Sequence, residues 1–116
     1  MGDGERWLLD DWQTPQGNHP VWAYVDALSK GARAKVYAAL DRLAEHGNRL
    51  GMPLSRALGG GLFELRVGYP EGPFRLIYCF RPGRRIVVLH AFTKRTEQTS
   101  KEDLELARAR AATLDE

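Results

Sequence analysis

The chain has 116 residues, of which 43% are hydrophobic and 28% charged, and these values exclude a disordered chain. A chain of this length buries roughly two-thirds of its unfolded surface, which is enough for one hydrophobic core. No apolar run approaches the roughly 20 residues of a membrane span, and the N-terminus lacks the basic-then-apolar order of a signal peptide. We therefore expect one domain over residues 1–116, located in the cytoplasm.

Cysteine and histidine are too sparse for a metal centre. Cys79 is the only cysteine, which excludes an internal disulfide and a cysteine-cluster metal site. The three histidines are far apart and match no ligand motif. We expect neither a metal nor a cofactor.

The basic residues are concentrated in the middle of the chain. Residues 56–101 contain nine Lys/Arg and three Asp/Glu, a net charge of +6, whereas residues 102–116 contain two Arg and five acids. A local excess of this size indicates an anionic partner, nucleic acid first, although a solvated basic face is the alternative.

The N-terminal half predicts a short strand followed by two helices. Apolar residues over 6–12 indicate a strand, and the segment 14–20, rich in Pro, Gly and Asn, is typical of a loop. Pro20 suits the first turn of a helix, and the apolar residues after it recur at helical spacing. A second helix is predicted over 31–46, with Gly47 as its stop. Being close in sequence, the two helices are expected to form a helical hairpin.

The following segment changes to the alternation of a β-sheet. Three strands are predicted, over residues 62–67, 74–80 and 85–93, with turns at 70–73 and 81–84. The third strand is apolar on both faces and is expected to be central. Ser100 and Asp103 resemble a capping box that opens a final helix ending near Leu114. The predicted fold class is α+β: an antiparallel sheet with an N-terminal helical hairpin and a C-terminal helix.

Four basic residues lie on, or directly after, the predicted strands: Arg66, Arg75, Lys94 and Arg95. Adjacent strands are about 4.8 Å apart, so these residues can converge into one cationic patch. Guanidinium groups suit phosphate because their planar fork donates two hydrogen bonds. For any single arginine, an ordinary solvent-facing role is the alternative.

Three other strand residues are expected to be structural. Tyr78 alternates against Arg75 and belongs to the core, and Cys79 is expected to be a small buried hydrophobe. His90 lies on the same side of its strand as Phe92 and is expected to be a hydrogen-bonded, buried histidine.

Three sequence segments carry a family resemblance: Gly61-Leu-Phe-Glu-Leu-Arg66, Phe74-Arg-Leu-Ile-Tyr78 and Leu89-His-Ala-Phe-Thr-Lys-Arg-Thr96. Together they resemble the RelE/HigB-type toxins of bacterial type II toxin–antitoxin systems, in the phage-derived Gp49-like branch of the RelE/ParE superfamily. The resemblance covers about residues 18–112. The combination of the three segments is more specific than any one of them.

This resemblance implies a microbial-RNase-like domain that cleaves mRNA on the ribosome without a metal. The 2′-hydroxyl of the RNA attacks the adjacent phosphate, and the protein orients the attack and neutralises charge. Arg75 matches the phosphate-stabilising arginine, and Arg66 a basic sheet residue near the RNA. Lys94 and Arg95 match the basic pair after the last strand. The implied partners are mRNA on the ribosome and a cognate helix-turn-helix antitoxin, with operator DNA bound only through the antitoxin complex.

The sequence departs from this pattern in its proton-transfer group. Several relatives carry a tyrosine or histidine near the C-terminus, whereas here no Tyr follows Tyr78 and no His follows His90. Glu64 is the candidate general base if it faces the arginines; ordinary polar surface is the alternative. Two other functions stay open: a ParE-like toxin that inhibits gyrase without nuclease activity, and a degenerate toxin that only binds its antitoxin. The four basic residues favour RNA cleavage.

Overall fold

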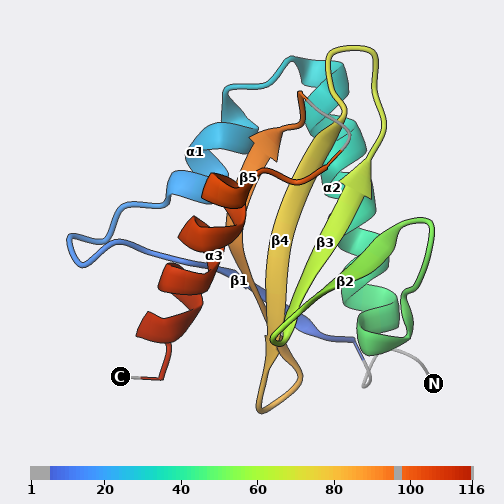
Figure 1. Cartoon of the computed structure of the whole chain (residues 1–116). Helices are drawn as coiled ribbons and strands as arrows, with labels where there is room; N and C mark the ends of the chain where they lie inside the picture. The colour runs from blue at the N-terminus through green and yellow to red at the C-terminus, as the bar shows by residue number, and fades with distance from the viewer. Residues whose placement is uncertain (1–5, 96–97, 116) are drawn as a thin grey trace.

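The computed structural model describes residues 6–95 and 98–115 and consists of a five-stranded sheet with helices on both faces (Figure 1). The strands are β1 (Leu8–Asp11), β2 (Ser55–Gly59), β3 (Leu62–Val67), β4 (Phe74–Arg81) and β5 (Arg85–Thr93). The helices are α1 (Pro20–Asp26), α2 (Lys30–His46) and α3 (Lys101–Thr113), with a short 3-10 turn over Gly47–Arg49.

The strand order is β1-β5-β4-β3-β2. Strands β2 to β5 form an antiparallel meander, whereas β1 pairs with β5 in parallel, from Leu8 opposite Arg85 to Asp11 opposite Val88. The sheet is therefore mixed, and the prediction of a purely antiparallel sheet was wrong. Parallel pairing requires a long crossover connection, and here the two helices α1 and α2 lie within the connection that follows β1.

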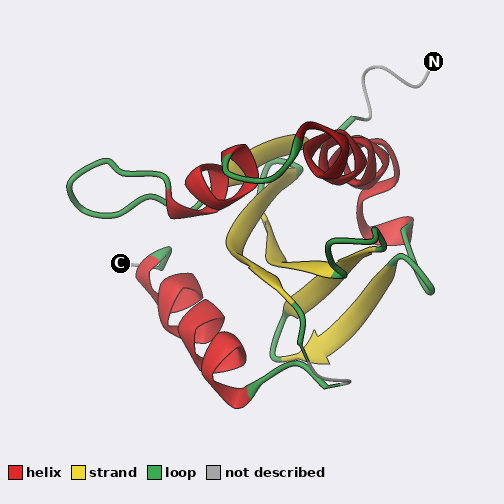
Figure 2. Cartoon of the chain, turned by 90° about the horizontal axis from the view of Figure 1, so that it is seen from above, coloured by secondary structure: helices red, strands yellow, loops and turns green. Residues whose placement is uncertain are grey.

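Helices α1 and α2 cover one face of the sheet (Figure 2). The apolar stripe of each helix is buried against the sheet in one cluster. The cluster contains Val21 and Val25 of α1, Val36, Leu40 and Leu43 of α2, and the sheet residues Leu65, Phe74, Leu76 and Tyr78. Each helix thus buries the stripe that its periodicity predicted. The two helices do not open the chain as a hairpin, because β1 precedes them and both pack on the sheet.

Helix α3 covers part of the opposite face. It buries Ala107, with Leu104, Ala111 and Leu114 beside it, against the sheet residues Leu62, Ile77, Cys79, Val87 and Leu89. Figure 2 shows α3 on the far side of the sheet from α1 and α2. The helix packs mainly on β5 and β4.

The predicted helix ends are confirmed at their capping residues. The Ser100 hydroxyl accepts a hydrogen bond of 3.0 Å from the Asp103 amide at the start of α3. Gly47 caps α2 with a φ of 56°, a conformation that favours glycine. None of the helices in the described ranges is long and apolar enough to cross a membrane.

Two further differences concern the sheet. The central strand is β4 and not the strand over 85–93, which lies between β4 and the short β1. Strand β2, at the edge next to β3, was not predicted, because Ser55–Gly59 is mostly exposed and shows no apolar alternation. The register of β4 with β5 shifts between Ile77, which pairs with His90, and Tyr78, which pairs with Val88. Irregularities of this kind increase the local twist of a strand pair.

Candidate functional site

Two rows of cross-strand partners place the charged residues on one face of the sheet. The first row runs from Arg56 on β2 through Glu64 and Ile77 to His90. The second row runs from Arg66 on β3 through Arg75 to Phe92. Directly opposed residues share a face, and so do residues two apart on one strand. Since Ile77 packs beneath α3, both rows lie on the α3 side of the sheet.

Arg75 is the best-anchored cation of this face. Its exposed fraction is only 6%, and its Nη1 donates a 2.9 Å hydrogen bond to the Phe74 carbonyl oxygen. Its Nε lies 3.7 Å from Oε1 of Glu64, a residue that is fully buried. Burial lowers the pKa of Arg75, the Glu64 carboxylate opposes that shift, and the charge of Arg66 adds to it. The attraction of the Glu64 carboxylate thus offsets part of the free-energy cost of burying the Arg75 guanidinium.

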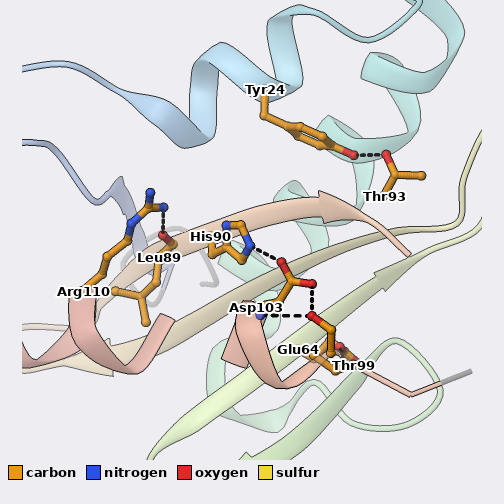
Figure 3. Close-up of polar contacts among 9 residues, drawn as sticks. Tyr24, Glu64, Leu89, His90, Thr93, Thr99, Asp103 and Arg110 are labelled. Carbon is orange, nitrogen blue, oxygen red and sulfur yellow. Dashed lines mark hydrogen bonds and ion pairs between the residues drawn. The ribbon is translucent and has the colours of Figure 1, made fainter. Parts of the chain in front are cut away.

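The carboxylate of Glu64 is covered by the segment that leads into α3. The Thr99 hydroxyl donates a hydrogen bond to Glu64 Oε2 (Figure 3). Neither Glu64 Oε1 nor Arg75 Nε has a hydrogen-bond partner among the described residues. Glu64 therefore faces the arginines, as the sequence analysis required of a candidate base, but its carboxylate has no exposed surface.

Lys94 joins this group from the end of β5. Its amide donates a 2.8 Å hydrogen bond to the Pro73 carbonyl oxygen, which ties the residue to the start of β4. Burial lowers the pKa of Lys94, and the charges of Arg75, Arg66 and Arg56 lower it further, while Glu64 raises it. The charges of these three arginines thus disfavour the charged form of Lys94. Arg66 and Arg75 lie directly opposite each other on β3 and β4, and Lys94 follows β5, the other neighbour of β4.

Arg95 follows Lys94 at the end of β5 and is exposed. Burial of the phenol raises the pKa of Tyr24 on α1, while the hydrogen bond with Thr93 and the charge of Arg95 lower it. Arg95 and Lys94 both line a cleft of about 480 Å³ that reaches from Tyr24 to Asp103. The predicted basic pair therefore borders one cleft next to the opposed arginines.

Sequence reasoning missed two residues of this site. Arg56 lies on the unpredicted strand β2, and only the register with Glu64 brings it into the cationic face. Thr99 contacts Glu64 across 35 positions of sequence, which no local pattern indicates. Two of the three structural expectations are confirmed, because Tyr78 and Cys79 are buried. His90 is hydrogen-bonded as expected, with its Nε2 2.6 Å from Asp103 Oδ1, but it is only partly buried.

Fold and site together define a small α+β protein with a mixed sheet, one face of which carries a cationic group around a buried arginine–glutamate pair. Residues 23–112 match the family described as phage-derived protein Gp49-like (DUF891), and the chain belongs to this family. The family is part of the RelE-like group of toxin–antitoxin proteins, which implies a toxin and an antitoxin partner. No curated protein matches the chain.

Proposed function

We propose that this protein is the toxin of a type II toxin–antitoxin pair and acts as a metal-independent endoribonuclease on mRNA in the ribosome. The observation that supports the proposal is the pair Arg66 and Arg75, directly opposed on one sheet face with Arg75 buried, and Lys94 tied by its amide to Pro73 at the start of β4. A cationic group with this internal repulsion gains stability when a phosphate binds to it. Family membership supports the toxin half of the proposal.

The reaction is an intramolecular transfer within the RNA. The 2′-hydroxyl oxygen forms a bond with the neighbouring phosphorus, and the bond from that phosphorus to the 5′-oxygen breaks. In net terms one proton passes from the first oxygen to the second, leaving a 2′,3′-cyclic phosphate and a 5′-hydroxyl. Arg75 and Lys94 would neutralise the extra negative charge of the pentacoordinate transition state, and Arg66 would hold the adjacent backbone.

The burial of Glu64 favours a positioning role over that of general base. A general base must come within about 3.2 Å of the proton that it removes, and Glu64 has no exposed surface and lies beneath Thr99. Its carboxylate instead lies 3.7 Å from Arg75 and attracts that guanidinium. Glu64→Gln is therefore expected to lower the cleavage rate through a displaced Arg75.

The test uses translating ribosomes carrying an mRNA with a single 2′-O-methyl nucleotide in the A-site codon. We expect the purified toxin to cut the unmodified message, with cyclic-phosphate and 5′-hydroxyl ends, and to spare the linkage after the methylated nucleotide. Cleavage of the methylated linkage, or products with 5′-phosphates, would contradict the mechanism. An intact message after addition of the toxin, together with DNA breaks in cells that express it, would show a gyrase-inhibiting toxin instead.

A further inference from the structure

A cleft beside the cationic face lies at the open edge of β5. Strand β1 pairs only with Arg85–Val88, so the rest of β5 has no strand partner on this side. Helix α1 approaches that edge with Tyr24, and the start of α3 approaches it with Ser100 and Asp103. Figure 3 shows Tyr24 on one side of β5 and the His90–Asp103 pair on the other. The cleft measures about 480 Å³, within the roughly 300–1,000 Å³ of small-ligand sites.

The lining of this cleft combines aromatic rings with short polar groups. Phe92 lines it, and the His90 ring stacks on Phe92 at a centroid distance of 5.1 Å and an interplanar angle of 21°. The polar groups are fixed in pairs: Tyr24 Oη lies 2.5 Å from Thr93 Oγ1, and Ser100 Oγ donates to Asp103 Oδ2 at 2.5 Å. Aromatic faces for stacking and oriented hydroxyl and carboxylate groups are what proteins use to bind an unpaired nucleobase.

Lys94 connects the cleft to the cationic face. It lines the cleft, and its ammonium group also interacts with Arg75 and Arg66. A ligand whose phosphate contacts Lys94 and Arg75 can therefore place an attached planar group in the cleft. A nucleotide of single-stranded RNA has this combination of a phosphate and an attached planar base.

We propose that the cleft between Tyr24, Phe92 and Asp103 binds one nucleobase of the RNA, next to the phosphate held by Arg75 and Lys94. This inference rests on the proposed function, because it takes the cationic face as the phosphate site. Phe92 supplies the stacking surface, while Thr93, Ser100 and Asp103 meet the polar edge of the base. These residues, and not the arginines, then determine base preference.

The test compares two uncleavable ligands of equal charge: a 2′-O-methyl trinucleotide and the same trinucleotide without bases. We expect the ligand with bases to bind about ten-fold tighter, as one base–aromatic stack would give. Phe92→Leu and Tyr24→Leu should each remove most of this difference, because only the ligand with bases loses an aromatic contact. Tyr37→Leu, at an exposed tyrosine of α2 outside the cleft, is the matched control and should change neither affinity.

The outcomes separate this proposal from the function on which it rests. Equal affinity for both ligands would overturn the base site while the phosphate site stands. A base-dependent affinity that survives both Phe92→Leu and Tyr24→Leu would place the base elsewhere and also overturn it. Absence of binding by either ligand would contradict the phosphate site itself.

Discussion

Arg75 on β4 lies directly opposite Arg66 on β3, so two like charges share one rung of the sheet. Like charges in this position destabilise a sheet, and within residues 6–95 and 98–115 the buried carboxylate of Glu64 lies 3.7 Å from Arg75 and compensates part of its charge. A fold selected for stability alone has no need of this arrangement. The proposed binding of a phosphate to the α3 face of the sheet would account for it.

Arg66→Met should stabilise the fold and weaken RNA binding. The substitution removes the charge opposite Arg75 and keeps a long apolar side chain, so the free energy of unfolding should rise by up to about 1 kcal/mol. Affinity for a 2′-O-methyl RNA should fall several-fold. Urea unfolding and fluorescence anisotropy measure the two effects, with Lys35→Met on α2 as the control. If Arg66→Met lowered both the free energy of unfolding and the affinity for RNA, Arg66 would be needed for stability, and RNA binding would not be the reason for its position opposite Arg75.

Arg75→Ala should destabilise the protein strongly. It leaves the buried carboxylate of Glu64 without its cation, and breaking a buried pair in this way costs about 3 kcal/mol or more. The double variant Glu64→Gln/Arg75→Ala should recover much of that loss, since no buried charge remains. Urea unfolding of both variants checks this. Equal free energies of unfolding for the single and double variants would show that the buried charge of Glu64 does not need Arg75 as its partner.

Lys94→Gln should stabilise the protein at neutral pH, and this gain should vanish in alkali. The pKa of Lys94 is lowered in the folded chain, first by burial and then by the neighbouring arginines. At neutral pH the charged lysine costs free energy in the folded chain, through burial and repulsion, and not in the unfolded chain. As the pH rises through the lowered pKa towards the ordinary value of 10.5, the folded chain loses this proton first and the penalty disappears. Unfolding curves from pH 7 to 10.5 measure the difference, with Lys35→Gln, at an exposed lysine of α2, as the control.

Arg56→Gln should reduce the salt dependence of RNA binding. Each phosphate contact to a single strand contributes about −0.7 to the slope of log affinity against log salt, and Arg56 is close enough to Lys94 to lower its pKa. We expect the slope to become shallower by about 0.7, with a weaker affinity at low salt. An unchanged slope would place Arg56 outside the RNA path.

Local patterns predicted the elements that local chemistry determines. Ser100 and Asp103 marked the start of α3, and Gly47 the end of α2. The alternation of residues 62–67 and 74–80 correctly separated the side chains of β3 and β4 that face α3 from those that face α1 and α2. Alternation alone did not establish that Arg66 and Arg75 share a face, because turns and bulges can shift the register; the pairing of β3 with β4 establishes it.

What depends on long-range pairing was not predictable. The parallel register of β1 with β5 joins residues more than seventy positions apart in sequence, and a strand's residues do not indicate its partner. Strand β2 is held by its pairing with β3, since Ser55–Gly59 buries little apolar surface of its own. The site follows the same rule: Arg56 and Thr99 reach Glu64 only through these non-local contacts.

The most direct test of the central claim is a map of RNA 5′ ends in cells after brief expression without antitoxin, for the natural chain and for Arg75→Lys. The lysine keeps a charge beside Glu64 but lacks the two-pronged guanidinium donor. We predict new 5′-hydroxyl ends within translated codons, in register with the reading frame, and a large decrease of these ends in the variant. Growth arrest without such ends, or ends equally abundant with Arg75→Lys, would contradict an endoribonuclease that acts through Arg75.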